Sequence, residues 1–171
     1  MPACSQEFAV EPATSISPVT IRNYQPGDEA CFQRLNEAWI AKYFVLEAKD
    51  REILGDPVKY IMNPGGEIVF ATIGEEIVGC CGLMPIAPGE YEVAKMAVTE
   101  ACQGRGIGRK ILDAIIDEAK RMGAKRLYLE TNSKLPSATH LYESVGFRHL
   151  PVEGRKPSVY VRADVFMEMF L

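Results

Sequence analysis

Cysteine is scarce in this chain, and its spacing forms no recognisable pattern. The count is odd, and no Cys-x-x-Cys pair occurs. Disulfide scaffolds and structural zinc sites both need paired cysteines at defined spacings, so the sequence predicts reduced thiols and no bound metal. The cysteines are Cys4, Cys31, Cys80, Cys81 and Cys102.

Long apolar runs and basic blocks are also missing. No apolar run approaches the ~20 residues that a membrane-spanning helix needs. A net charge of −4, with no Lys/Arg cluster, argues against a nucleic-acid partner. Residues 1–17 have neither the basic start nor the apolar centre of a secretory signal, and we expect them to form a flexible leader. We therefore expect a cytoplasmic protein with no membrane partner.

The remaining chain has the composition of an ordinary globular domain. Of 171 residues, 47% are hydrophobic and 25% are charged, which suits a single domain that we place at residues 18–171. Strand-like and helix-like segments alternate, which predicts an α/β protein with helices on both faces of a mixed sheet. Expected strands cover 19–23, 67–73, 77–86, 90–98, 126–132, 147–150 and 159–170, and expected helices cover about 26–43, 56–62, 107–121 and 135–145.

The most informative stretch is Gln103-Gly104-Arg105-Gly106-Ile107-Gly108, which lies between an expected strand and an amphipathic helix. The first turn of a helix has backbone N–H groups without internal partners, at the positive end of the helix dipole. Glycines let a bulky anion approach these groups closely. The pattern therefore indicates a phosphate or pyrophosphate site.

Three kinds of phosphate-binding motif could explain this glycine pattern. A nucleoside-triphosphate loop requires Gly-x-x-x-x-Gly-Lys-Ser/Thr, which is absent here. A dinucleotide fingerprint would require a small residue where Arg109 or Ile111 stands, although Glu130 follows at the place of a ribose-binding acid. A dinucleotide-binding protein is kept as a remote alternative. The third pattern, Gln103-x-x-Gly106-x-Gly108, resembles the acetyl-CoA signature of the GNAT superfamily of N-acetyltransferases.

Three more segments resemble GNAT motifs in family order. Residues 92–98 resemble the central strand, residues 126–132 the next strand with its Glu-Thr-Asn ending, and residues 138–147 the motif Ala-x-x-Leu-Tyr-x-x-x-Gly-Phe. The resemblance spans about residues 67–150. It implies a mostly antiparallel sheet of about seven strands with about four helices, in which the fourth and fifth strands splay apart at the cofactor site. It also implies an acyltransferase that uses acetyl-CoA in a ternary complex.

The resemblance further implies which residues contact the co-substrate. Arg105 and Arg109 would add charge near the pyrophosphate, or else are surface cations. Asn132 would bond the pantetheine arm, or else caps the following helix. Tyr142 would protonate the leaving thiolate, with a purely structural role as the alternative. The expected co-substrate residues are Met96, Ala97, Val98, Gln103, Gly104, Arg105, Gly106, Ile107, Gly108, Arg109, Asn132 and Tyr142.

Glu92 is the favoured general base. Strict alternation along the strand puts it on one face with Ala94, Met96 and Val98, close to the expected thioester. A buried carboxylate with a raised pKa could accept a proton from an ammonium group. Glu90 and Glu130 are rivals, and water could serve instead.

The acceptor is the least defined part of the hypothesis. Aromatic residues with one acid suit an amine, and an adjacent cation would suit an amino-acid carboxylate, although packing or surface roles explain each residue equally well. Small amines, amino acids, antibiotics and the N-terminus or lysine of a peptide stay open, as does a homodimer. A non-catalytic CoA sensor or interaction module is the alternative function. The acceptor candidates are Trp39, Tyr43, Phe44, Glu47, Arg155 and Lys156.

Overall fold

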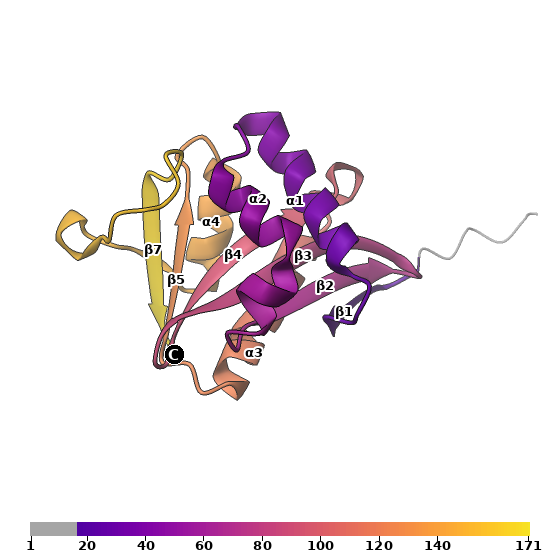
Figure 1. Cartoon of the computed structure of the whole chain (residues 1–171), viewed down its shortest axis with the longest axis horizontal. Helices are drawn as coiled ribbons and strands as arrows, with labels where there is room; N and C mark the ends of the chain where they lie inside the picture. Colours follow the sequence, from indigo (N-terminus) through magenta and orange to yellow (C-terminus); the bar gives the residue numbers. More distant parts are fainter. Residues whose placement is uncertain (1–16) are drawn as a thin grey trace, which may run out of the picture.

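A seven-stranded sheet with helices on both faces forms the body of the protein (Figure 1). The computed structural model describes residues 17–171, so the expected leader lies almost wholly outside the described residues. The strands are β1 (Val19–Asn23), β2 (Glu67–Ile73), β3 (Glu76–Ala87), β4 (Glu90–Val98), β5 (Arg126–Thr131), β6 (Arg148–His149) and β7 (Val165–Phe170). The α-helices are α1 (Glu29–Tyr43), α2 (Ala48–Gly55), α3 (Ile107–Arg121) and α4 (Pro136–Val145). The expected α/β class is confirmed.

Strand order in the sheet is β1-β2-β3-β4-β5-β7-β6, and every neighbouring pair except β4 and β5 is antiparallel. The parallel pairing of β4 with β5 extends only from Glu90–Arg126 to Glu92–Tyr128. Beyond these residues the two strands diverge, as the resemblance implied. The backbone of β4 from residue 93 onward therefore keeps unpaired hydrogen-bonding groups on the side facing β5.

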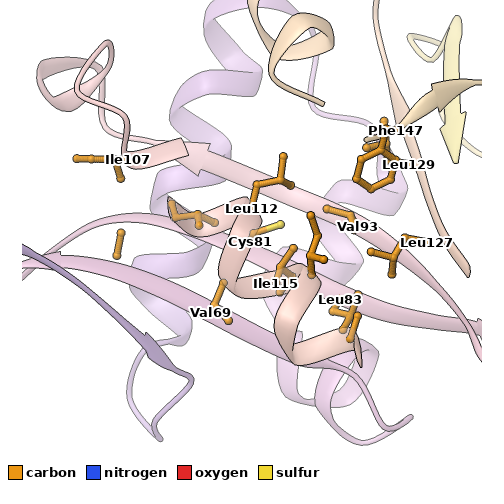
Figure 2. Packing of buried hydrophobic residues seen from close by; sticks show 14 of the residues in the cluster. Val69, Cys81, Leu83, Val93, Ile107, Leu112, Ile115, Leu127, Leu129 and Phe147 are labelled. Carbon is orange, nitrogen blue, oxygen red and sulfur yellow. The ribbon is translucent and has the colours of Figure 1, made fainter. Parts of the chain in front are cut away.

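Two separate apolar clusters stabilise the two faces of the sheet. We call them the α1 cluster, which includes Phe32, Ile40 and Phe70, and the α3 cluster, which includes Val69, Ile111 and Ile115. Helices α1 and α2 cover one face, and α3 lies across the other (Figure 1). The apolar stripe of α3 recurs every three or four residues, and Figure 2 shows Leu112 and Ile115 of this helix against Val69, Cys81 and Leu83 of the sheet. Because helices cover both of its faces, the sheet is a rigid frame that holds the end of β4 in place.

A β-bulge interrupts β4 at Lys95. Between the paired positions Gly82–Ala94 and Cys80–Ala97, β4 has one residue more than β3, and Lys95 has a φ of +54°. The bulge shifts the alternation, so that Val93 and Met96 both contact the α3 cluster while Ala97 belongs to the α1 cluster. The prediction that Glu92 shares a face with Met96 was therefore wrong. Glu92 is paired with Met84, which packs on the α1 cluster.

Three elements differ most from the sequence-based expectations. Helix α2 was not expected, because only Ile53 and Leu54 supply its buried apolar side chains and the third buried residue is charged. The helix expected over 56–62 is a five-residue π-helix at Val58–Met62, preceded by Pro57. The strand expected from residue 159 begins at Val165, because side-chain bonds hold residues 158–162 in a loop.

Candidate active site

One cavity of about 660 Å³ opens where β4 and β5 diverge. Its wall combines the end of α1, the bulged part of β4, the start of α3, the end of β5, the start of α4 and the loop before β7. Arg105, Glu47, Arg155 and Lys156 do not line it. Of the residues expected from the sequence, the wall includes Trp39, Tyr43, Phe44, Glu92, Met96, Ala97, Val98, Gln103, Gly104, Gly106, Ile107, Gly108, Arg109, Asn132 and Tyr142.

The glycine-rich bend and the first turn of α3 form one end of the cavity. Gly104 and Gly106 have φ angles of 73° and 75°, in the left-handed region that favours glycine. A Cβ at either position would meet no atom within 4 Å, so open space lies beside both. Gly106 is the N-cap of α3 and supplies no side-chain cap, which leaves the first amides of this helix available to an anion.

Gly108 has a different task from the two glycines before it. A Cβ there would lie 3.2 Å from Leu141 Cδ2 and 3.3 Å from Met96 Cε. Contacts this tight show that the absence of a side chain lets α3 pack against both α4 and β4. Of the three glycines in the motif, Gly104 and Gly106 therefore leave open space beside the backbone, whereas Gly108 allows close packing of α3.

Tyr142 reaches the cavity from α4. Its ring packs edge-on against Phe147, with 6.1 Å between centroids, at the border of the α3 cluster. Among the described residues its hydroxyl has no hydrogen-bond partner, and burial raises the pKa of this phenol above its usual range. The group is therefore a neutral O–H donor at the cavity wall throughout the neutral range.

Glu92 is the cavity carboxylate whose proton affinity is most altered. Burial, reinforced by the nearby negative charge of Glu130 and opposed by Lys95, raises its pKa to about 7. No described residue donates a hydrogen bond to it. Its rivals are engaged: Glu90 pairs with Arg126 at 2.9 Å, and Glu130 accepts bonds from Tyr128 and Ser158. Of these carboxylates, Glu92 is the one free to exchange a proton.

A buried ion network that sequence reasoning missed forms the floor beside Glu92. Asp50, whose side chain is 0% exposed, accepts Lys95 Nζ at 2.6 Å and two guanidinium bonds from Arg162 at 2.6 and 2.8 Å. Burial opposes ionisation of Asp50, but the bonds from Arg162 and Lys95 prevail and lower its pKa to about 2. Lys95 also donates to Tyr160 Oη at 2.9 Å. We call Glu47, Asp50, Lys95, Tyr160 and Arg162 the ion cluster.

Glu47 acts within this cluster rather than in the cavity wall. Its carboxylate accepts Val161 N at 3.0 Å and Arg162 Nη1 at 3.2 Å, which fastens the loop before β7 to the start of α2. No sequence signal distinguished Asp50 from the charged surface residues around it. The sequence Val159-Tyr160-Val161-Arg162 alternates like a strand. For this reason the sequence did not predict that Tyr160 and Arg162 belong to the site.

Other expected residues occupy structural or surface positions. Asn132 donates to the carbonyl of Arg162 and accepts Lys134 N at 2.8 Å, so it fixes the loop and does not cap α4. Arg155 donates to the Leu150 carbonyl at 3.1 Å and stacks over Phe166. The side chain of Arg105, on the surface, is directed to Cys102 Sγ. Arg155 and Lys156, the cations that were expected to bind an amino-acid carboxylate, therefore do not line the cavity near Glu92.

Two further features of residues 17–171 bear on metal binding and on membrane insertion. No group of three or more His, Cys, Asp and Glu side chains there could hold a metal ion. No helix in this part of the chain is long and apolar enough to span a membrane.

Comparisons with known proteins agree on one kind of relative. The family model described as "Acetyltransferase (GNAT) family" matches residues 25–147. The chain is 37% identical over 91 residues to the uncharacterized N-acetyltransferase YjgM of Escherichia coli, and 38% identical over 98 residues to the N-alpha-acetyltransferase RimI of Mycobacterium tuberculosis. These alignments cover 52% and 56% of this chain and 54% and 60% of the relatives, so the chain spans little more than half of their length.

Solved structures resemble the fold over more of the chain. An acetyltransferase of the GNAT family from Staphylococcus aureus superposes with a TM-score of 0.80 at 22% identity, over 90% of this chain and 99% of that one. A putative acetyltransferase from Salmonella typhimurium, solved with its cofactor acetyl-CoA, superposes with a TM-score of 0.71 at 20% identity, over 89% and 93%.

Proposed function

Because the chain belongs to the GNAT family of acetyltransferases, we propose that it transfers the acetyl group of acetyl-CoA to a primary amine by direct attack in a ternary complex. Family membership supports an acyltransferase activity. One observation carries the finer proposal: a single cavity joins an uncapped helix N-terminus, the unpaired edge of β4, a free phenol and a free carboxylate. These are the groups that thioester aminolysis requires.

The phosphate end of the cavity fits coenzyme A. The amides of residues 107–109 lie at the positive end of a 15-residue helix, where a pyrophosphate is favoured. The unpaired edge of β4 offers N–H and C=O groups to the amides of the pantetheine arm, in the manner of an added strand. A backbone N–H of this edge would also stabilise the negative charge that develops on the thioester oxygen.

The proton transfers are assigned to Glu92 and Tyr142. Glu92, with a pKa of about 7, is ionised in a large fraction of molecules near neutrality and accepts a proton from the incoming ammonium, directly or through water. The neutral amine then attacks the carbonyl carbon, and the carbon–sulfur bond breaks as the tetrahedral intermediate collapses. Tyr142 donates its proton to the departing thiolate, and the extra proton on the amide nitrogen passes to the resulting tyrosinate, directly or through water.

Replacing Gly106 with valine tests the cofactor assignment. The wild-type melting temperature should rise with acetyl-CoA, because a ligand that binds only the native state stabilises it. A branched side chain at φ 75° would cost about 1–2 kcal/mol and fill the open space beside the amides, so the variant should fold but lose the acetyl-CoA shift. Differential scanning fluorimetry measures both effects.

The matched control is Gly123→Val, just beyond the other end of α3. Gly123 has a φ of 79° and open space around it, so the strain is similar, yet it lies outside the cavity. This variant should keep the acetyl-CoA shift. Stabilisation by NAD in place of acetyl-CoA would instead restore the dinucleotide interpretation.

Replacing Glu92 with glutamine tests the base. In single-turnover experiments the wild-type rate should rise with pH through an apparent pKa near 7, because the ionised form is the active one. The amide cannot accept the proton, so this acidic limb should vanish while acetyl-CoA affinity is kept. A variant with an unchanged limb but a raised acceptor KM would mean that water takes the proton and Glu92 only binds the ammonium.

Acetyl-CoA binding without thiol release against any amine would contradict the catalytic proposal. It would favour the non-catalytic sensor, which no feature of the cavity supports.

A further inference from the structure

We propose that the acceptor is an amine with an apolar or aromatic body and no carboxylate close to its amino group. This inference rests on the proposed function and adds a substrate class to it. Its basis is the balance of charge at the end of the cavity beside Glu92, together with the side chains that form the wall there.

The two cations of the ion cluster are already neutralised. Lys95 and Arg162 are both bonded to Asp50, and Arg162 also bonds to Glu47. The two positive charges of the ion cluster therefore meet two negative ones. With 5% and 15% of their side chains exposed, Lys95 and Arg162 have little freedom to turn toward a ligand. An incoming carboxylate would have to compete with a buried carboxylate that holds two partners.

The charges left over at this end are negative. Glu92 and Glu130 both line the cavity, and they lie close enough for the charge of Glu130 to raise the pKa of Glu92. Of the other cations of the wall, Arg109 of α3 pairs with Asp113, and Lys134, in the loop between β5 and α4, lies close enough to Asp164 to lower the pKa of that carboxyl. An ammonium group is therefore attracted to Glu92, whereas a carboxylate on the neighbouring carbon is repelled.

Aromatic side chains from the end of α1 line the same cavity. Trp39 and Phe44 pack edge-to-face with 6.2 Å between centroids, and Tyr43 continues this surface toward solvent with 46% of its area exposed. Val45 and Val161, which directly follow the wall residues Phe44 and Tyr160, are 77% and 96% exposed. Apolar surface this close to a charged pocket suits an acceptor whose body is apolar.

Phenethylamine, phenylalanine and phenylalaninamide separate these effects. All three carry the same ring, but only phenylalanine has a carboxylate beside the amine, and the amide imitates a peptide N-terminus. We expect phenethylamine to exceed phenylalanine by on the order of 100-fold in kcat/KM, because like charges at close range cost several kcal/mol. Ethylamine, which lacks the ring, should fall about tenfold below phenethylamine.

Phenylalaninamide separates the two sources of a carboxylate-free amine. Acetylation of the amide at the rate of phenethylamine, or faster, points to peptide N-termini, and much slower acetylation points to small monoamines. Either result is compatible with the inference, provided that phenylalanine is the poor substrate.

A charge variant tests whether the acids cause the discrimination. Glu130→Gln should improve the phenylalanine-to-phenethylamine ratio of kcat/KM by about tenfold, since it removes one repelling charge. The amide oxygen still accepts one of the bonds from Tyr128 and Ser158, and the amide N–H can donate to the hydroxyl oxygen of the other. Glu143→Gln, an exposed site on α4 outside the cavity, removes the same net charge and should leave the ratio unchanged.

Titration calorimetry of the same amines into the CoA-bound protein keeps the two proposals distinguishable. Equal binding or equal turnover of phenethylamine and phenylalanine would overturn the substrate class and leave the acetyltransferase function intact. Selective binding of phenethylamine without any acetylation would support the substrate class and count against the catalytic role.

Discussion

Tyr142→Phe is expected to lower the single-turnover rate by about 10²–10⁴-fold while acetyl-CoA binds nearly as well as before. The phenol would give its proton to sulfur as the carbon–sulfur bond breaks, so its contribution belongs to the transition state and hardly to the bound ground state. The substitution removes one oxygen and keeps the ring contact with Phe147. Rapid-quench kinetics and calorimetry measure the two quantities.

Tyr91→Phe is the matched control for this substitution. Tyr91 packs on the same apolar cluster as Tyr142 but does not line the cavity, so its hydroxyl should be dispensable for the rate. The raised pKa of Tyr142 also requires that the wild-type rate does not fall as pH approaches the usual value for tyrosine. A Tyr142→Phe protein that keeps its turnover would reduce the role of this residue to packing.

Asp50→Asn should reduce the free energy of unfolding by about 3–5 kcal/mol, which is the cost of removing one partner from a buried ion pair. The amide keeps the shape of the side chain but leaves Lys95 and Arg162 facing each other without their shared carboxylate. Urea denaturation at neutral pH measures the loss.

The difference in unfolding free energy between wild type and Asp50→Asn should depend on pH. The pKa of Asp50 is lowered to about 2, so its contribution is full above the unfolded value near 3.8 and is lost as pH falls toward 2. The difference between wild type and Asp50→Asn should shrink over that interval. Glu52→Gln, which breaks an exposed pair with Lys49 on the same helix, should cost less than about 1 kcal/mol. Equal losses for both variants would contradict the special place of Asp50.

The glycine-rich end of the cavity was predictable because its residues are local in sequence. Gln103 to Arg109 are consecutive, and the amphipathic stripe of α3 follows at once, so pattern alone indicated an anion site at a helix start. The hairpin of β2 and β3 was equally predictable because its apolar residues are buried, and α4 was predictable because its stripe residues Leu141 and Val145 pack against the α3 cluster.

The opposite end of the site could not be predicted, because its members look like surface residues. Asp50 stands in the run Lys49-Asp50-Arg51-Glu52, where nothing singles out one charge as buried. Lys95 is placed by a bulge, and a positive φ in a lysine has no signature in the sequence. The strand-like alternation of residues 159–162 is overridden by bonds from Glu47, which only the folded chain brings near.

The bonds from α2 to Arg162 also bear on the order in which the domain assembles. They join residues 112 and 115 positions apart, whereas the glycine-rich bend connects neighbouring elements. Closing so long a loop is entropically costly, and each doubling of loop length adds about 0.6 kcal/mol. Contacts of such high sequence separation form late and slow the search for the native state. The glycine-rich end of the cavity can thus be complete on the folding pathway before the wall that contains Arg162 exists.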